Sequence, residues 1–170
     1  MAKISDSKTC REQYSNAQMM VHNIPLLSMY VLGTILIWFF NFYLTILFII
    51  YLVISNYLFM ILICGFCPHY GTRSSICGYG LLAKKVTKRK SVREFRSSFL
   101  KNIAVIFPNW FLPFFIGIYL LYIDFSILIL VLLIVFAVVG FAVVPYISKS
   151  KSCNSCKLRK TCPWMSLCSR

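Results

Sequence analysis

The sequence predicts an all-α integral membrane protein with four transmembrane helices in two hairpins, an amphipathic juxtamembrane helix, and a Cys-rich cytosolic loop and tail. Hydrophobic residues make up 59% of the 170 residues, above the roughly 45–50% of soluble domains. They gather in two runs, residues 24–63 and 103–147, and each run is too long for one crossing of a bilayer core about 30 Å thick. The net charge of +14 must then lie outside the bilayer.

The N-terminal part consists of a polar segment, residues 1–23, and a first hairpin, residues 24–63. The polar segment has no evident cleavage site, so we expect it to remain in the mature protein. The apolar run would be ~60 Å long as a single helix, so it is predicted to break at Asn41, within "FFNFY". The expected helices cover residues 24–40 and 43–63, with Trp38 and Tyr43 at interface depth.

The second hairpin is predicted over residues 103–147, where Asp124 is the only charged residue. A carboxylate at the bilayer centre costs roughly 2.5–3.5 kcal/mol, so Asp124 is expected in a surface turn between helices at 103–123 and 126–147. Pro108 and Pro113 predict either a late start at Pro108 or a kink in the first of these helices. Small residues in "AVVGFA" favour close helix contact in the second.

All 18 Lys and Arg residues and all eight cysteines fall in three segments, residues 1–23, 64–102 and 148–170. Basic residues beside membrane spans mark the cytoplasmic side. We therefore expect both termini to be cytoplasmic, in the plasma (cytoplasmic) membrane, with residues 64–102 forming a cytosolic loop and residues 148–170 a cytosolic tail. Cytosolic thiols are normally kept reduced, which argues against structural disulfides.

Two cysteine motifs suggest a metal site: "CGFCPHYGTRSSIC" and "CNSCKLRKTCPWMSLC". A C-x2-C turn lets two thiolates reach one ion, and further thiolates complete a shell of four ligands. The spacings match neither ferredoxins nor a paired zinc ribbon, so zinc and an iron–sulfur cluster both remain open, as do one shared site and two. The predicted ligands are Cys64, Cys67, Cys77, Cys153, Cys156, Cys162 and Cys168, with Cys10 and His69 as further candidates. His22 is interpreted as an interface residue.

Residues 81–101 carry eight basic residues and an apolar periodicity with a change of phase near Arg89. This pattern predicts an amphipathic helix on the inner leaflet, where each basic residue contributes about 1 kcal/mol against acidic lipid headgroups. Nucleic acid is the rival partner for a basic patch, but the juxtamembrane position favours lipid, and we do not expect nucleic-acid binding.

These features predict a small membrane protein with a cytosolic cysteine-ligated metal module, an electron-transfer or assembly subunit of a larger membrane complex. Its partners would be other membrane subunits or further copies of itself. The alternative is a membrane thiol–disulfide oxidoreductase that uses a C-x-x-C pair, so enzymatic activity remains open. Transport is disfavoured because the spans contain few polar side chains, namely Asn56, Ser55, Thr34, Thr45, Asn109 and a few tyrosines.

Overall fold

The computed structural model describes residues 15–67, 70–71, 79–91 and 94–148, and within these ranges it contains helices and no strands. Seven of the nine predicted ligands lie outside the described residues: Cys10, His69, Cys77, Cys153, Cys156, Cys162 and Cys168. The α-helices are α1 (Asn16–Phe40), α2 (Phe42–Leu62), α3 (Tyr79–Val86), α4 (Phe95–Asn102), α5 (Pro108–Ile123), α6 (Ile127–Ala137) and α7 (Val144–Ile147). Two 3-10 turns, η1 (Cys64–Phe66) and η3 (Ile103–Val105), and a π-helix, η4 (Val138–Val143), connect them.

Four helical stretches are long and apolar enough to cross a membrane, which confirms the predicted number of candidate spans. They are Asn16–Phe40, Phe42–Phe66, Phe95–Ile123 and Ile127–Ile147. Only 17–22% of the most apolar window in each stretch is buried inside the bundle. Most of the apolar side chains therefore face outward, as expected for helices whose surroundings are lipid.

The first hairpin turns at Asn41, as predicted. This residue is extended, with φ −162° and ψ 128°, and its side chain accepts a hydrogen bond from the Leu44 amide at 3.1 Å. Its own amide still donates to the Ile37 carbonyl. A single residue thus ends α1 and caps α2, because an asparagine side chain replaces one of the hydrogen bonds that the start of a helix lacks.

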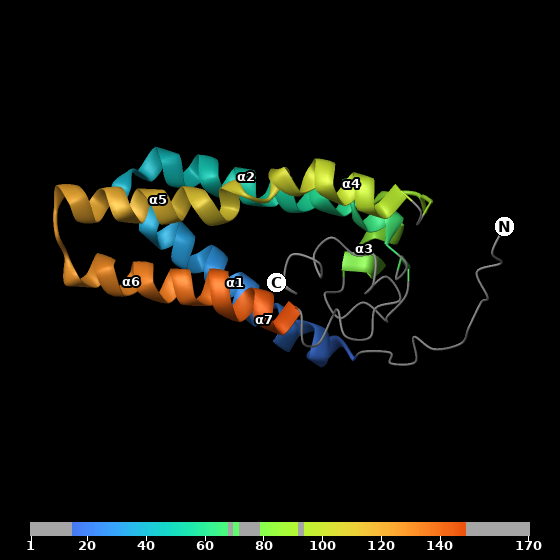
Figure 1. The fold of residues 1–170 in the computed structure, drawn as a ribbon, viewed down its shortest axis with the longest axis horizontal. Coiled ribbons are helices and arrows are strands. Elements are labelled where there is room, and N and C mark those ends of the chain that lie inside the picture. Colours follow the sequence, from blue (N-terminus) through green and yellow to red (C-terminus); the bar gives the residue numbers. More distant parts are fainter. Residues whose placement is uncertain (1–14, 68–69, 72–78, 92–93, 149–170) are drawn as a thin grey trace.

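The second hairpin turns at Asp124, which is exposed and extended, and α6 begins three residues later. Its position between α5 and α6 agrees with the predicted turn. Both turns lie at the same end of the bundle, and α3 and α4 lie at the opposite end (Figure 1). The Lys and Arg residues that the structure describes all belong to residues 84–101 and are all exposed, so charge is concentrated at the end that contains α3 and α4.

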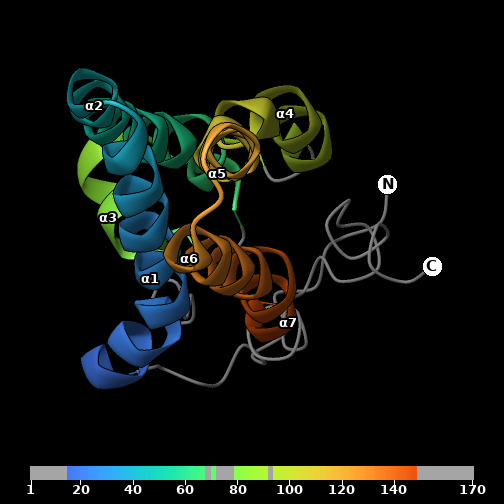
Figure 2. The same ribbon diagram turned by 90° about the vertical axis from the view of Figure 1, so that its left-hand side faces the viewer.

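Helix α1 contacts α2, α5, α6 and η4 and runs obliquely along the bundle (Figure 1). In the end-on view α5, α6 and α7 lie on one side of α1 (Figure 2). Its Met29 and Leu36 form the main apolar core with Leu133 and Phe136 of α6. Three glycines permit close helix approaches, because small residues let helices pack tightly in membranes. A Cβ added to any of them would lie close to a neighbouring side chain. The added atom would be 3.0 Å from Pro113 at Gly33, 2.7 Å from Leu133 at Gly117, and 3.1 Å from Met29 at Gly140.

The secondary structure of residues 79–102 differs from the prediction of one amphipathic helix over residues 81–101. They form two helices, α3 and α4, and residues 87–91 between them are not helical. Both helices pack on the end of α2. The Ser98 hydroxyl of α4 donates to the Leu62 carbonyl at 2.7 Å, and Ala83 of α3 is fully buried beside Met60. The interruption of the helix at residues 87–91 accounts for the change of phase of the apolar positions near Arg89.

The third candidate span begins at Phe95, eight residues before the predicted start at Ile103. Helix α4 and α5 follow one another along the long axis of the bundle (Figure 1). Proline causes the break between them: α5 starts at Pro108, where a missing amide is tolerated, and the 3-10 turn η3 precedes it. The late start predicted from Pro108 is therefore correct for α5, while the helical stretch as a whole is longer.

Candidate functional site

The two predicted metal ligands within the described residues, Cys64 and Cys67, flank one tight turn at the end of α2. The Cys67 amide donates to the Cys64 carbonyl at 3.1 Å, which closes the 3-10 turn η1. Cys64 is buried with Met60 and Ala83, whereas Cys67 is half-buried. The C-x2-C segment thus forms a compact turn, with Cys64 at its first position and Cys67 directly after its end.

The basic segment after α3 lies across this turn. The Lys90 amide donates to the Gly65 carbonyl at 2.9 Å, and the Lys90 ammonium lies 4.9 Å from the centre of the Phe66 ring. A Cβ on Gly65 would lie 3.3 Å from the Lys88 carbonyl oxygen, so glycine permits this close approach. The ammonium group of Lys90 therefore contacts Phe66, which lies between the two cysteines in the chain.

Within the described ranges, no three His, Cys, Asp or Glu side chains lie close enough together to hold a metal ion. Seven of the nine predicted ligands belong to other parts of the chain, so the zinc or iron–sulfur site stays a prediction. His22, interpreted from the sequence as an interface residue, lies on α1 and lines a cavity that the sequence did not predict.

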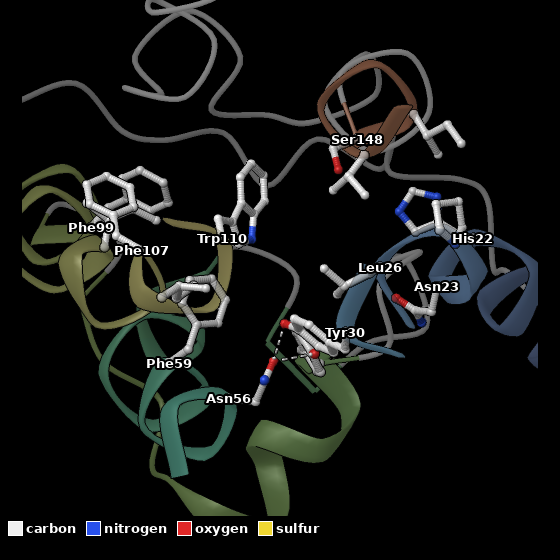
Figure 3. Close-up of a pocket in the computed structure, with 16 residues that line it drawn as sticks. His22, Asn23, Leu26, Tyr30, Asn56, Phe59, Phe99, Phe107, Trp110 and Ser148 are labelled. Carbon is white, nitrogen blue, oxygen red and sulfur yellow. Dashed lines mark hydrogen bonds between the residues drawn. The ribbon is translucent and has the colours of Figure 1, made fainter. Parts of the chain in front are cut away.

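That cavity has a volume of about 310 Å³ and is shown in close-up in Figure 3. Its lining includes residues of α3 and α4, so it lies at the end of the bundle that contains these helices. Its walls come from both hairpins: α1 and α7 contribute one part, and α2, α3 and the stretch from α4 to α5 contribute the rest. The lining is mainly apolar. It comprises His22, Asn23, Pro25, Leu26, Tyr30, Asn56, Phe59, Tyr79, Phe99, Ile103, Ile106, Phe107, Trp110, Val144, Ile147 and Ser148.

A polar cluster formed by Tyr30, Asn56 and Tyr79 interrupts the apolar wall (Figure 3). The Tyr30 hydroxyl donates to Asn56 Oδ1 at 3.1 Å, and the Tyr79 hydroxyl donates to the same oxygen at 3.0 Å. Asn56 Nδ2 donates to the Leu52 carbonyl at 2.8 Å. These bonds hold the amide in one orientation and join α1, α2 and α3.

A second polar pair links α2 to α5. Asn109 Nδ2 donates to the Ser55 hydroxyl oxygen at 3.0 Å, and these side chains are 1% and 0% exposed. Thr34 and Thr45, in contrast, bond to carbonyls one turn earlier in their own helices. Three of the five polar span residues noted in the sequence therefore make contacts between helices, and Asn56 faces a cavity.

Trp110 of α5 forms a further part of the cavity wall. Its Nε1 is buried and has no hydrogen-bond partner among the described residues. In Figure 3 this nitrogen lies on the edge of the indole that is directed toward the cavity. Sequence reasoning missed the cavity because its lining residues are scattered from position 22 to position 148, and no local spacing connects them.

Comparisons of this chain with models of known protein families, with curated proteins and with solved structures find no match. The site must therefore be interpreted from its own chemistry.

Proposed function

We propose that this chain is a multi-pass membrane protein that carries a cysteine-ligated metal module, either zinc or an iron–sulfur cluster, at the end of the bundle containing α3 and α4. It serves as an electron-transfer or assembly subunit of a larger membrane complex. The observation that carries this proposal is the turn from Cys64 to Cys67, which is held directly at the end of the second candidate span.

The chemistry of this turn supports metal binding. A nearby positive charge favours the thiolate form that binds metals, and Lys90 is held against the turn by its own amide and by the ring of Phe66. Burial of Cys64 among apolar side chains acts in the opposite direction, because it disfavours a charged thiolate. A bound cation would compensate for that cost, since a thiol that coordinates a metal ion releases its proton to solvent and binds as the thiolate.

The remaining ligands are proposed from sequence. The C-terminal segment supplies four cysteines within sixteen residues, enough to complete one site by itself. The middle segment would then need Cys10 or His69 beside Cys64, Cys67 and Cys77. Alternatively, the two cysteine-rich segments share one site. In either arrangement most of the ligands are drawn from seven cysteines, with Cys10 and His69 as further candidates: Cys64, Cys67, Cys77, Cys153, Cys156, Cys162 and Cys168.

The proposed setting is the plasma (cytoplasmic) membrane with both termini in the cytoplasm. The exposed basic residues between positions 84 and 101 support an orientation toward acidic lipid headgroups. The outward-facing apolar surface of the four candidate spans supports contact with lipid, with other membrane subunits or with a second copy of the chain.

The experiment is anaerobic purification in detergent, followed by an absorption spectrum and an assay of iron, sulfide and zinc. Visible absorption together with iron and sulfide indicates electron transfer, and colourless protein with zinc indicates an assembly role. Cys156→Ser should abolish metal retention if the C-terminal site is autonomous, whereas Cys64→Ser should abolish it if the segments share one site. Ser152→Ala is the matched control and should retain the metal.

A metal-free protein with a titratable dithiol would overturn the metal proposal. It would favour the thiol–disulfide oxidoreductase instead, with Cys64 and Cys67 or Cys153 and Cys156 as the redox pair. In that case Cys67→Ser should eliminate the first of these dithiols without changing the second.

A further inference from the structure

We propose that the cavity between the two hairpins binds one neutral molecule from the bilayer, an apolar chain or ring system that carries a carbonyl oxygen. This inference rests on the cavity alone and does not depend on the proposed metal module. Its volume of about 310 Å³ lies at the lower end of the range for small-molecule sites, which are mostly apolar with a few placed polar groups.

The lining determines the apolar part of the ligand. Leu26, Phe59, Ile106 and Val144 are among the apolar side chains of the wall. A cavity with such walls holds water poorly, and an empty one leaves the lining atoms without contact partners. Phe107 at the wall is 49% exposed, so the lining reaches the surface of the bundle, where an apolar ligand could enter from lipid.

The same lining excludes a charged ligand. Among the described residues that line the cavity there is no Lys, Arg, Asp or Glu. A charge taken out of water without an opposite charge or several hydrogen bonds is very costly. A free phosphate, a carboxylate or a metal ion is therefore a poor occupant, and the head of a bound lipid would have to remain outside.

The polar groups of the wall are suited to a carbonyl acceptor. The Tyr30 and Tyr79 hydroxyls donate to Asn56 Oδ1, and a hydroxyl can rotate toward a different acceptor. Trp110 Nε1 is a donor only, is buried, and lacks a partner among the described residues. A buried donor without an acceptor costs free energy, which a ligand carbonyl on the cavity side of the indole would recover (Figure 3).

Two bilayer molecules share this chemistry: the ester-linked acyl chain of a phospholipid, and a prenylated quinone. Both combine a neutral carbonyl with an extended apolar part. The indole of Trp110 provides a direct reporter, because quinones and brominated acyl chains both quench tryptophan fluorescence on contact.

The test uses two single-tryptophan variants of the full chain in detergent micelles without added phospholipid, so that no host lipid competes with the probe. Trp38→Phe with Trp164→Phe keeps Trp110 in the cavity wall. Trp110→Phe with Trp164→Phe keeps Trp38, which is 55% exposed on α1 and reports contact with bulk lipid. Each variant is titrated with a decyl-chain benzoquinone and, separately, with phosphatidylcholine brominated on its acyl chains.

We expect quenching of Trp110 to saturate with one of the two probes while quenching of Trp38 rises in proportion to the probe in the micelle. Saturation by the benzoquinone identifies a quinone site, and saturation by the brominated lipid at low mole fraction identifies a phospholipid site. Leu26→Phe, which fills part of the cavity, should raise the half-saturating concentration at least tenfold. Leu47→Phe on the exposed face of α2 should leave it unchanged.

A second measurement needs no substitution. The detergent-purified wild-type chain should retain about one quinone or phospholipid molecule after extensive washing, detected by mass spectrometry of an organic extract. Proportional, non-saturating quenching of both tryptophans with both probes, together with an extract that contains neither molecule, would overturn the proposal.

Discussion

Asn109 of α5 donates a hydrogen bond from its side-chain amide to the hydroxyl oxygen of Ser55 on α2 at 3.0 Å, and both residues are almost completely buried. The bond joins α2 of the first hairpin to α5 of the second in the interior of the bundle. Ser55 also donates to the Leu52 carbonyl at 3.2 Å, which orients its oxygen as an acceptor for the amide.

Because of this arrangement, Ser55→Ala and Asn109→Ala should each destabilise the bundle, and their effects should not add. A double-mutant cycle should give a coupling energy of about 0.6–1.7 kcal/mol, the range of hydrogen bonds between membrane helices. Unfolding in detergent of rising SDS content, followed by circular dichroism, measures these values. Ser97→Ala, at an exposed position of α4, is the control. Strictly additive effects would show that the pair contributes no coupling.

The two glycine contacts made by α1 should respond differently to an added methyl group. Alanine at Gly33 would meet the ring of Pro113 at 3.0 Å and Phe136 at 3.2 Å, and the proline ring has little freedom to move. Alanine at Gly140 would meet the flexible thioether of Met29 at 3.1 Å. Overpacking typically costs about 1–3 kcal/mol. We expect Gly33→Ala to fall in this range and Gly140→Ala to cost less, as measured by thermal unfolding. The reverse order would contradict the packing described for α1.

Tyr51 stabilises the break between α4 and α5. Its hydroxyl donates to the Val105 carbonyl at 2.7 Å, an oxygen whose usual helical donor, the Asn109 amide, bonds to Ile106 instead. Tyr51→Phe should therefore cost about 1 kcal/mol and speed hydrogen exchange of the amides from position 103 to position 107. Tyr57→Phe is the matched control, because Tyr57 is 50% exposed on the same helix. Equal exchange rates in the two variants would exclude this role.

The position of the two hairpin turns gives a prediction about orientation. An epitope inserted directly after Phe125, in the turn between α5 and α6, should be bound by antibody on intact cells. This turn lies at the end of the bundle opposite the basic residues (Figure 1). An epitope inserted between Ser91 and Val92 should be bound only after permeabilisation. Detection of the second epitope on intact cells would show that the basic end faces outward. The cysteines near that end would then not be cytosolic, and the argument that they stay reduced would fail.

Several elements of the fold could be predicted from the sequence because their causes are local. The length of each apolar run against the thickness of a bilayer sets the number of spans, and Asn41 and Asp124 mark the turns through capping and charge. The start of the third span at Phe95 was missed. Residues 95–102 read as an amphipathic surface helix, whereas the bond from Ser98 to the Leu62 carbonyl holds them along α2.

The candidate site depended on tertiary structure in a different way. The sequence determined that Asn56, Tyr30 and Trp110 lie in apolar segments, and it identified Cys64 and Cys67 as a C-x2-C pair. Only the tertiary structure decided that Asn56 meets Tyr30 and Tyr79 and that Trp110 faces the same cavity. The rotation of each helix about its axis sets those contacts. Such a rotation depends on contacts between different helices, such as the close approach of Gly33 to Pro113, which the local sequence does not reveal.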